Sequence, residues 1–270
     1  MVKRLWKFLQ GTYLGIMLLF LYAPIFFLII YSFNSSKTLG NWTGFTFDWY
    51  VKLVTNSTII DAIWVTVSVA VISSIAATVL GTAAAIGIQS MKKRRRSLIL
   101  GVSQLPMVNP DLVTGVSLML LFMFVGLRNG YVRLLIAHIT FNIPYVLFSV
   151  LPRLRQSSDM LYEAALDLGC TPMQALWKVV IPDISPGIIS GFILAFTLSI
   201  DDFVISFFAG NGVDNLSMYI FSSARQGVNP ALSTIIFIPV LTLLLIVNIR
   251  SIRKEREDEI QNKKTKIKTR

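Results

Sequence analysis

The sequence predicts an all-α, polytopic membrane protein with six transmembrane helices and both termini in the cytoplasm. Of its 270 residues, 54% are hydrophobic and only 14% are charged, and the charges leave long uncharged runs. A soluble domain carries roughly 25% charged residues, and a disordered chain has too few apolar residues to match. A nucleic-acid-binding protein could carry the net charge of +11 but not such apolar runs, so we expect no nucleic-acid partner.

Six runs are long enough to cross a lipid bilayer as helices. The hydrocarbon core is about 30 Å thick and needs about 20 helical residues. The runs lack the alternation of membrane β-strands. Pro106, Pro110 and Asp111 interrupt the third run. The predicted spans are Thr12–Phe33, Ala62–Ser90, Ser97–Leu127, Leu134–Leu151, Ile184–Ala209 and Ala231–Ile249.

The distribution of Lys and Arg sets the orientation. With the N-terminus inside, 20 of the 25 cations fall in cytoplasmic segments and 5 in external ones. Cytoplasmic loops of membrane proteins are enriched in these residues. We therefore expect a permease domain over residues 1–250 and a basic cytoplasmic tail over residues 251–270. The basic run Lys92–Arg96 fits a topology determinant that lies near anionic lipid.

The segment between the fourth and fifth spans, residues 153–183, predicts a cytoplasmic hairpin of two short helices. Ser158 or Asp159 can cap the first helix. Gly169 can end it, because glycine adopts the left-handed conformation without strain.

A second helix is predicted directly afterwards. Thr171 can cap it, and Pro172 suits its first position, where a backbone N–H would have no partner. We expect this helix to end at about Val180, because the residue before a proline disfavours the helical conformation and Pro182 follows closely.

This segment resembles the EAA motif of ABC-importer permeases. The resemblance rests on Glu163-Ala164-Ala165, Gly169 and Val179–Pro182 at the family's spacing, before the second-last span. It implies a type I ABC importer permease, in which the hairpin docks in a groove of the ATP-binding subunit and transmits its closure to the membrane helices. The residues to which it assigns this coupling role are Glu163, Ala164, Ala165, Gly169, Ile181 and Pro182.

The sequence contains no segment that could bind ATP by a P-loop. No stretch matches G-x-x-x-x-G-K-[ST]. If ATP drives the protein, a separate subunit must bind it, so we expect no enzymatic activity of the chain itself. The single cysteine, Cys170, gives no metal-binding pattern, and no cofactor is expected.

Three carboxylates, Asp111, Asp201 and Asp202, fall within predicted spans. Each costs about 2.5–3.5 kcal/mol near the centre of a spanning helix, so they are functional candidates. No Lys or Arg falls inside a predicted span to neutralise them. Arg128 and Arg133 lie near an outer end, and His138 is the only other candidate partner. On continuous helices, Asp111 and Asp201 would lie at similar depth, while Asp201 and Asp202 would point about 100° apart. We expect a layer of carboxylates that attracts a cation.

The segments that carry these aspartates, Met107–Val113 and Ala195–Val204, resemble permeases of spermidine/putrescine ABC importers of the PotC type, as do Tyr31–Ser36 and Ala137–Phe141. The resemblance implies polyamine uptake by alternating access in the inner membrane of a prokaryote, with the three aspartates along the pathway. The partners it implies are a sister permease subunit in a heterodimer, ATP-binding subunits and an extracytoplasmic polyamine-binding protein.

Two alternatives stay open. The chain could be an ABC permease for another small cationic or organic solute, because such relatives share the hairpin motif. A proton-coupled secondary cation carrier could use the same aspartates as a relay, but it would not need the hairpin.

Overall fold

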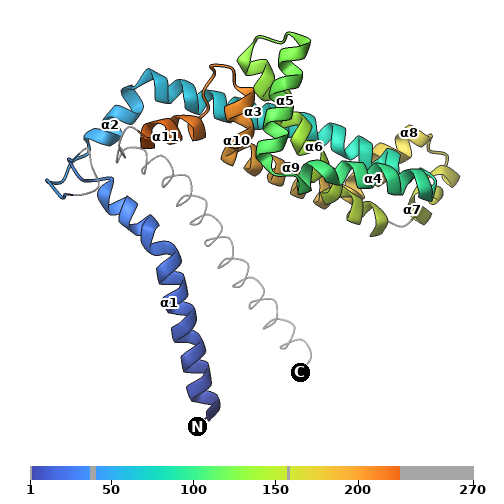
Figure 1. Ribbon diagram of the computed structural model, residues 1–270. Helices are drawn as coiled ribbons and strands as arrows, with labels where there is room; N and C mark the ends of the chain where they lie inside the picture. Colours follow the sequence, from blue (N-terminus) through green and yellow to red (C-terminus); the bar gives the residue numbers. More distant parts are fainter. Residues whose placement is uncertain (1, 37–40, 157–158, 226–270) are drawn as a thin grey trace. The chain divides into compact units, whose positions relative to one another are not determined.

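The computed structural model describes residues 2–36, 41–156 and 159–225, which are helical apart from turns and loops (Figure 1). Within these ranges there is no β-strand, only an isolated bridge between Asn34 and Phe45. The chain divides into two compact units, Thr58–Phe221 and Met1–Ser57 with Ser222–Arg270. The sixth predicted span and the basic tail lie outside the described residues.

The N-terminal unit begins with a long apolar helix, α1 (Val2–Tyr31). Nearly all of its described side chains from residue 11 to residue 30 are exposed, as expected for a lipid-facing helix. A loop follows in which Asn34 is fully buried and its carbonyl accepts a hydrogen bond of 2.7 Å from the Trp49 indole. Trp49 belongs to α2 (Asp48–Thr55), so this bond fixes α2 against the loop.

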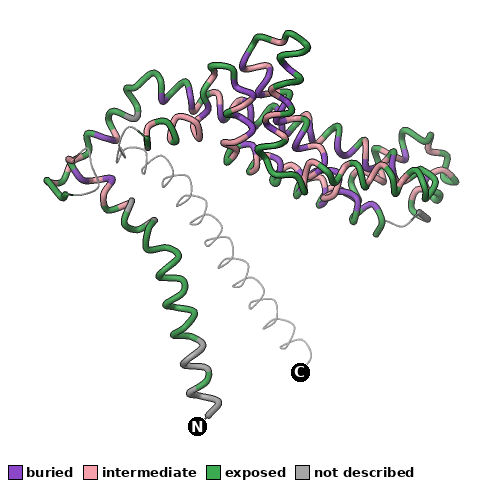
Figure 2. The backbone as a smooth tube through the Cα atoms, in the orientation of Figure 1, coloured by how far each residue is buried: buried purple, intermediate pink, exposed green. Residues whose placement is uncertain are grey.

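The second unit contains the remaining helices, except for Ser57 of the first of them and residues 222–225 of the last, which fall in the other unit. They are α3 (Ser57–Gln89), α4 (Lys93–Val108), α5 (Asp111–Val125), α6 (Gly130–Gln156), α7 (Asp159–Asp167), α8 (Pro172–Ala175), the π-helical turn η1 (Leu176–Val180), α9 (Ile181–Asp201), α10 (Val204–Ala209) and α11 (Leu216–Arg225). The main core lies between α3, α6 and α9, where buried residues alternate with exposed ones (Figure 2). Glycines allow the close approach: a Cβ added at Gly81 would lie 2.8 Å from that of Val146.

Within the described residues, four helices are long and apolar enough to cross a membrane: Gly11–Tyr31, Ser57–Gln89, Gly130–Gln156 and Pro172–Asp201. The pair α4 and α5 makes a fifth if it counts as one span. These helices coincide with the first five predicted spans, so the prediction of an apolar, all-α chain is confirmed at this level.

The third predicted span is interrupted at the position that its sequence indicates, between Pro106 and Asp111. The axes of α4 and α5 differ by 103°. The chain is extended at Asn109 and Pro110, because a residue before proline avoids the helical conformation. Asp111 therefore lies in the first turn of α5, and the depth expected for it on a continuous helix does not apply.

The fifth predicted span also breaks, at its two aspartates. Asp201 is the last residue of α9, and Asp202 is extended, with φ −65° and ψ 123°. The short helix α10 then begins at Val204. The angle of about 100° expected between Asp201 and Asp202 on one helix is therefore wrong.

Candidate functional site

The hairpin has the turn that its sequence predicts. Gly169 has a left-handed φ of +87°. Its N–H donates to the Leu166 carbonyl (2.9 Å), and the N–H of Cys170 donates to the Ala165 carbonyl (3.0 Å). These two bonds form a Schellman motif, which ends α7. Of the two predicted caps for α7, Ser158 lies outside the described residues.

The second helix of the hairpin begins as predicted. The Thr171 hydroxyl accepts a hydrogen bond from the Gln174 N–H (3.4 Å), and the Gln174 side chain accepts one from the Thr171 N–H (3.0 Å). Pro172 occupies the first turn of α8. This reciprocal capping box fixes where α8 starts.

This second helix does not end before Pro182, which corrects the prediction. After α8 the backbone widens into η1 and continues as α9, which contains Pro182 in its first turn. A proline lacks an N–H and crowds the carbonyl four residues earlier, and a π-helical turn at that place relaxes this spacing. As a result, the hairpin and the fifth span form one helix, Pro172–Asp201.

The residues of the coupling motif divide between an exposed and a covered side. Glu163 and Ala164 are exposed, whereas Ala165 is buried, so only one of the two alanines offers a free surface. Ile181 is half-buried and Pro182 is exposed. The hairpin also exposes large apolar side chains, a composition typical of protein interaction surfaces. They are Leu161, Leu168, Met173 and Trp177.

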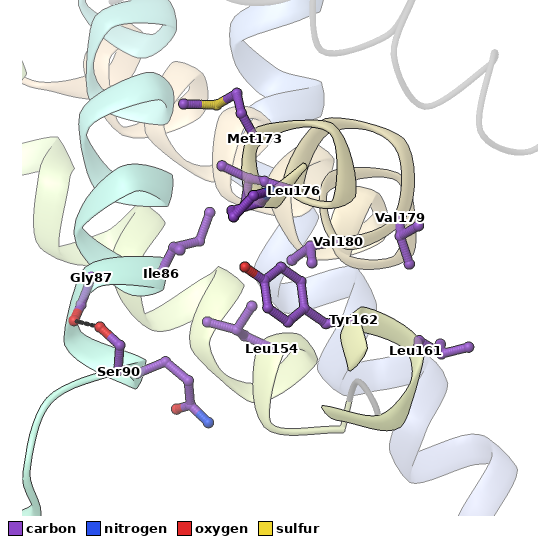
Figure 3. Close-up of a pocket in the computed structure, with 12 residues that line it drawn as sticks. Ile86, Gly87, Ser90, Leu154, Leu161, Tyr162, Met173, Leu176, Val179 and Val180 are labelled. Carbon is purple, nitrogen blue, oxygen red and sulfur yellow. Dashed lines mark hydrogen bonds between the residues drawn. The ribbon is translucent and has the colours of Figure 1, made fainter. Parts of the chain in front are cut away.

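A pocket of about 550 Å³ separates the hairpin from the ends of α3 and α6. In Figure 3 the Tyr162 side chain of α7 lies between Leu176 of η1 and Leu154 of α6, with Ile86 of α3 across the space. The hairpin is therefore not tightly packed against α3. Its firmest link to the membrane helices is the continuous backbone into α9.

Asp202 is held by hydrogen bonds at the other end of α9. Its carboxylate accepts bonds from the backbone N–H groups of Ile205 (3.2 Å) and Ser206 (2.8 Å) and from the Ser206 hydroxyl (2.7 Å). His138 Nε2 lies 3.5 Å from the same carboxylate, and the two side chains are 1% and 8% exposed. Asp202 thus caps α10 and is joined to α6, so the candidate partner His138 is indeed next to it.

A buried polar network of two separate hydrogen-bonded clusters joins the membrane helices, and Asp202, His138 and Ser206 form the first cluster. His138 Nε2 lies 3.0 Å from the Ser206 hydroxyl. The Asn142 side chain donates to the Ser199 hydroxyl (2.7 Å), which lies 3.1 Å from that of Ser73. These groups join α3, α6, α9 and α10. Ser73, Asn142 and Ser199 were not predicted from the sequence, in which an Asn within an apolar run was the one available signal.

Asp111 and Asp201 are exposed instead, and within the described ranges neither side chain forms a hydrogen bond or an ion pair. Asp111 is close enough to Tyr145 of α6 for an electrostatic interaction. One turn after Asp111, a Cβ added at Gly115 would lie 3.3 Å from the Cα of Ile205. The starts of α5 and α10, which directly follow the breaks in the third and fifth spans, therefore pack against each other.

This arrangement combines two exposed carboxylates with broken spans. Ionisable groups within spanning segments mark substrate pathways, and broken helices form ion and substrate sites in many transporters. Two negative charges without a protein cation attract a positively charged solute. No group of three or more candidate metal ligands occurs in the described parts of the chain.

Two curated relatives match this chain over most of its length. The spermidine/putrescine transport system permease protein PotC of Haemophilus influenzae is 37% identical over 244 residues, which cover 89% of this chain and 94% of the relative. The putrescine transport system permease protein PotI of Escherichia coli is 41% identical over 228 residues, which cover 80% and 81%.

The fold matches solved transporters. A chain of a bacterial alginate ABC transporter, solved in complex with an alginate pentasaccharide-bound periplasmic protein, superposes with a TM-score of 0.67. Its sequence is 19% identical, and the match covers 91% of this chain and 93% of that one. At this identity the likeness shows the fold alone. The model of one family matches residues 77–252, so the chain belongs to the binding-protein-dependent transport system inner membrane components.

Proposed function

We propose that the chain is the transmembrane permease subunit of an ABC importer that takes up polyamines, spermidine or putrescine, by alternating access. The observation that carries the proposal is the single helix Pro172–Asp201, which joins an exposed hairpin to an exposed carboxylate. The names of relatives that span most of the chain support the substrate class.

The hairpin is the docking element for an ATP-binding subunit. Leu168, Met173 and Trp177 offer an exposed apolar surface, and Ala164 leaves room for close approach. Because the backbone is continuous, a shift of the hairpin moves α9 with it. The η1 turn next to Pro182 is where this helix bends most readily.

The three aspartates serve the substrate pathway in two ways. Asp201 and Asp111 meet the ammonium groups of the polyamine, because their carboxylates have no cationic partner in the described structure. Asp202 acts by position: it caps α10 and bonds to α6, so it holds the break at which Asp201 ends α9.

The working assembly contains further subunits. It comprises a sister permease, ATP-binding subunits and an extracytoplasmic polyamine-binding protein, in an inner membrane that the chain crosses six times. Exposed apolar residues such as Val108 and Phe124 on α4 and α5 supply surface for lipid or for the sister subunit.

Reconstitution tests the transport activity. Proteoliposomes that contain the four kinds of subunit should accumulate radiolabelled spermidine or putrescine only when ATP is hydrolysed. Excess unlabelled polyamine should compete with this uptake. Uptake that survives ATP depletion and collapses with the proton gradient would indicate the secondary carrier instead, and lack of polyamine competition would indicate another solute.

Cys170 allows a direct test of the topology, because it is the single cysteine and lies half-exposed in the hairpin. A membrane-impermeant maleimide should label it in inside-out vesicles and leave it unlabelled in right-side-out vesicles. A Cys170→Ala variant is the matched control for background labelling. The reverse pattern would place the hairpin outside and contradict cytoplasmic docking.

A further inference from the structure

A groove runs between α4 and the C-terminal end of α6. It consists of two pockets of about 460 Å³ and about 520 Å³, which share Leu100 and Arg155 in their walls. Leu100, Phe148 and Leu151 form an apolar floor at one end. Leu100 and Phe148 pack against the hydrophobic core, so the floor is held in place by the fold.

The other end of the groove is cationic. Lys93, Arg96 and Arg155 line it, and none of them forms an ion pair within the described residues. Three cations that converge on one groove repel each other unless an anion lies between them. An anion bound at this end of the groove would therefore lower the repulsion among the three cations.

The surface of α4 places this groove at the edge of the hydrocarbon core. The first turn of α4 is basic, and within the next turns the helix exposes Leu98, Val102 and Leu105. Arg96 and Leu100 are one helical turn apart, or about 6 Å along the axis. A ligand that fits must therefore be anionic at one end and apolar directly beside it.

We propose that this groove binds one anionic phospholipid. Its phosphate lies among Lys93, Arg96 and Arg155, and an acyl chain lies along Leu100, Phe148 and Leu151. Basic pockets between spanning helices are known to bind such headgroups, whereas a free phosphate would leave the apolar floor uncovered. The bound lipid clamps α4 to α6 beside the hairpin.

The test uses the full chain purified from membranes, with phosphatidylglycerol as the probe. Native mass spectrometry should show one retained phosphatidylglycerol in the unaltered chain, and phosphatidylcholine should not replace it. The double variant Arg96→Gln/Arg155→Gln should weaken binding by about fivefold for each cation removed.

The matched control is Arg94→Gln/Arg95→Gln, which removes two exposed cations of the same run that do not line the groove. This control should retain the lipid. Equal loss in both double variants would show a diffuse charge effect and overturn the proposal.

Two further readouts identify the occupant. Leu100→Asn should weaken phosphatidylglycerol binding, and inorganic phosphate should not compete with the lipid; effective competition by phosphate would reject a lipid site. If the groove variant keeps its lipid but loses co-purifying subunits, the groove binds an acidic protein surface and the proposal is wrong.

Discussion

The helix Pro172–Asp201 is built differently at its two ends. At the hairpin end, the structure comes from residues close in sequence, through the Gly169 turn and the Thr171 cap, above a pocket of about 550 Å³. At the other end, Ser199 and Asp202 bond to helices distant in sequence. The hairpin can change its contacts at little cost to the fold, whereas the aspartate end cannot move without breaking buried hydrogen bonds.

The difference indicates how motion reaches the pathway. A partner that displaces the hairpin meets little resistance there, because local caps preserve its shape. The rigid end passes the displacement on to α3, α6 and α10 together, because the buried network joins them. Asp201 lies at this junction but outside the network, so it can bind a solute without disrupting the fold.

The largest expected effect tests that separation of Asp201 from the network. Asp201→Asn should lower the uptake efficiency, Vmax/KM, by about a hundredfold, chiefly through KM, because one charge-assisted contact with the substrate is lost. Thermal stability should stay unchanged. Radiolabelled uptake over a range of polyamine concentrations measures Vmax and KM. Asp61→Asn, which alters another exposed carboxylate, is the matched control and should transport normally.

Asp202 should behave in the opposite way. Asp202→Ala should lower the free energy of unfolding by about 2 kcal/mol, because α10 loses its cap and Ser206 and His138 lose a buried partner. Thermal unfolding in detergent measures this loss, and KM for the polyamine should change little.

Asp202→Asn separates the two roles further. Asparagine is as good a helix cap as aspartate, so Asp202→Asn should be more stable than Asp202→Ala. Any transport that Asp202→Ala loses through unfolding should return with this stability. If Asp202→Asn raised KM as strongly as Asp201→Asn, Asp202 would be a substrate contact and the division of roles would be wrong.

At the hairpin end, Gly169→Ala should weaken coupling by roughly fivefold. An alanine in the left-handed conformation costs about 1–2 kcal/mol, while a Cβ there would meet open space, so the effect is conformational and not steric. The number of polyamine molecules taken up per ATP hydrolysed measures this coupling. Gly101→Ala, in α4 with open space around it, should leave coupling intact. Equal effects of the two changes would count against the docking role.

The hairpin could be predicted because its signals are local. Gly169 permits the left-handed turn, Thr171 caps the helix that follows, and Pro172 fixes its own backbone angle, so their positions suffice. The continuation through Pro182 could not be predicted, because a π-helical turn has no sequence pattern of its own. Proline alone indicates an end to the helix.

The aspartate end was predicted only in outline. Apolar runs with embedded acids indicated the spans and the candidate residues. Pro110 accounts for the break in the third span, but the close packing of α5 against α10 and the contact of Asp202 with His138 could not be predicted from it. Such contacts join distant segments, and a single sequence does not encode them as a pattern.

The smallest expected effect tests whether the hairpin is held only by its own caps. Thr171→Ala removes the side chain that accepts the Gln174 N–H, and it should destabilise α8 by about 1 kcal/mol. Hydrogen exchange of the amides from Gln174 to Val180 should become faster, while that of α9 near Ser199 stays unchanged. Thr171→Ser keeps the hydroxyl and should restore slow exchange. Faster exchange at both ends would mean that the hairpin and the buried network unfold as one cooperative unit. The hairpin could then not move independently of the aspartate end, and the proposed difference between the two ends would be wrong.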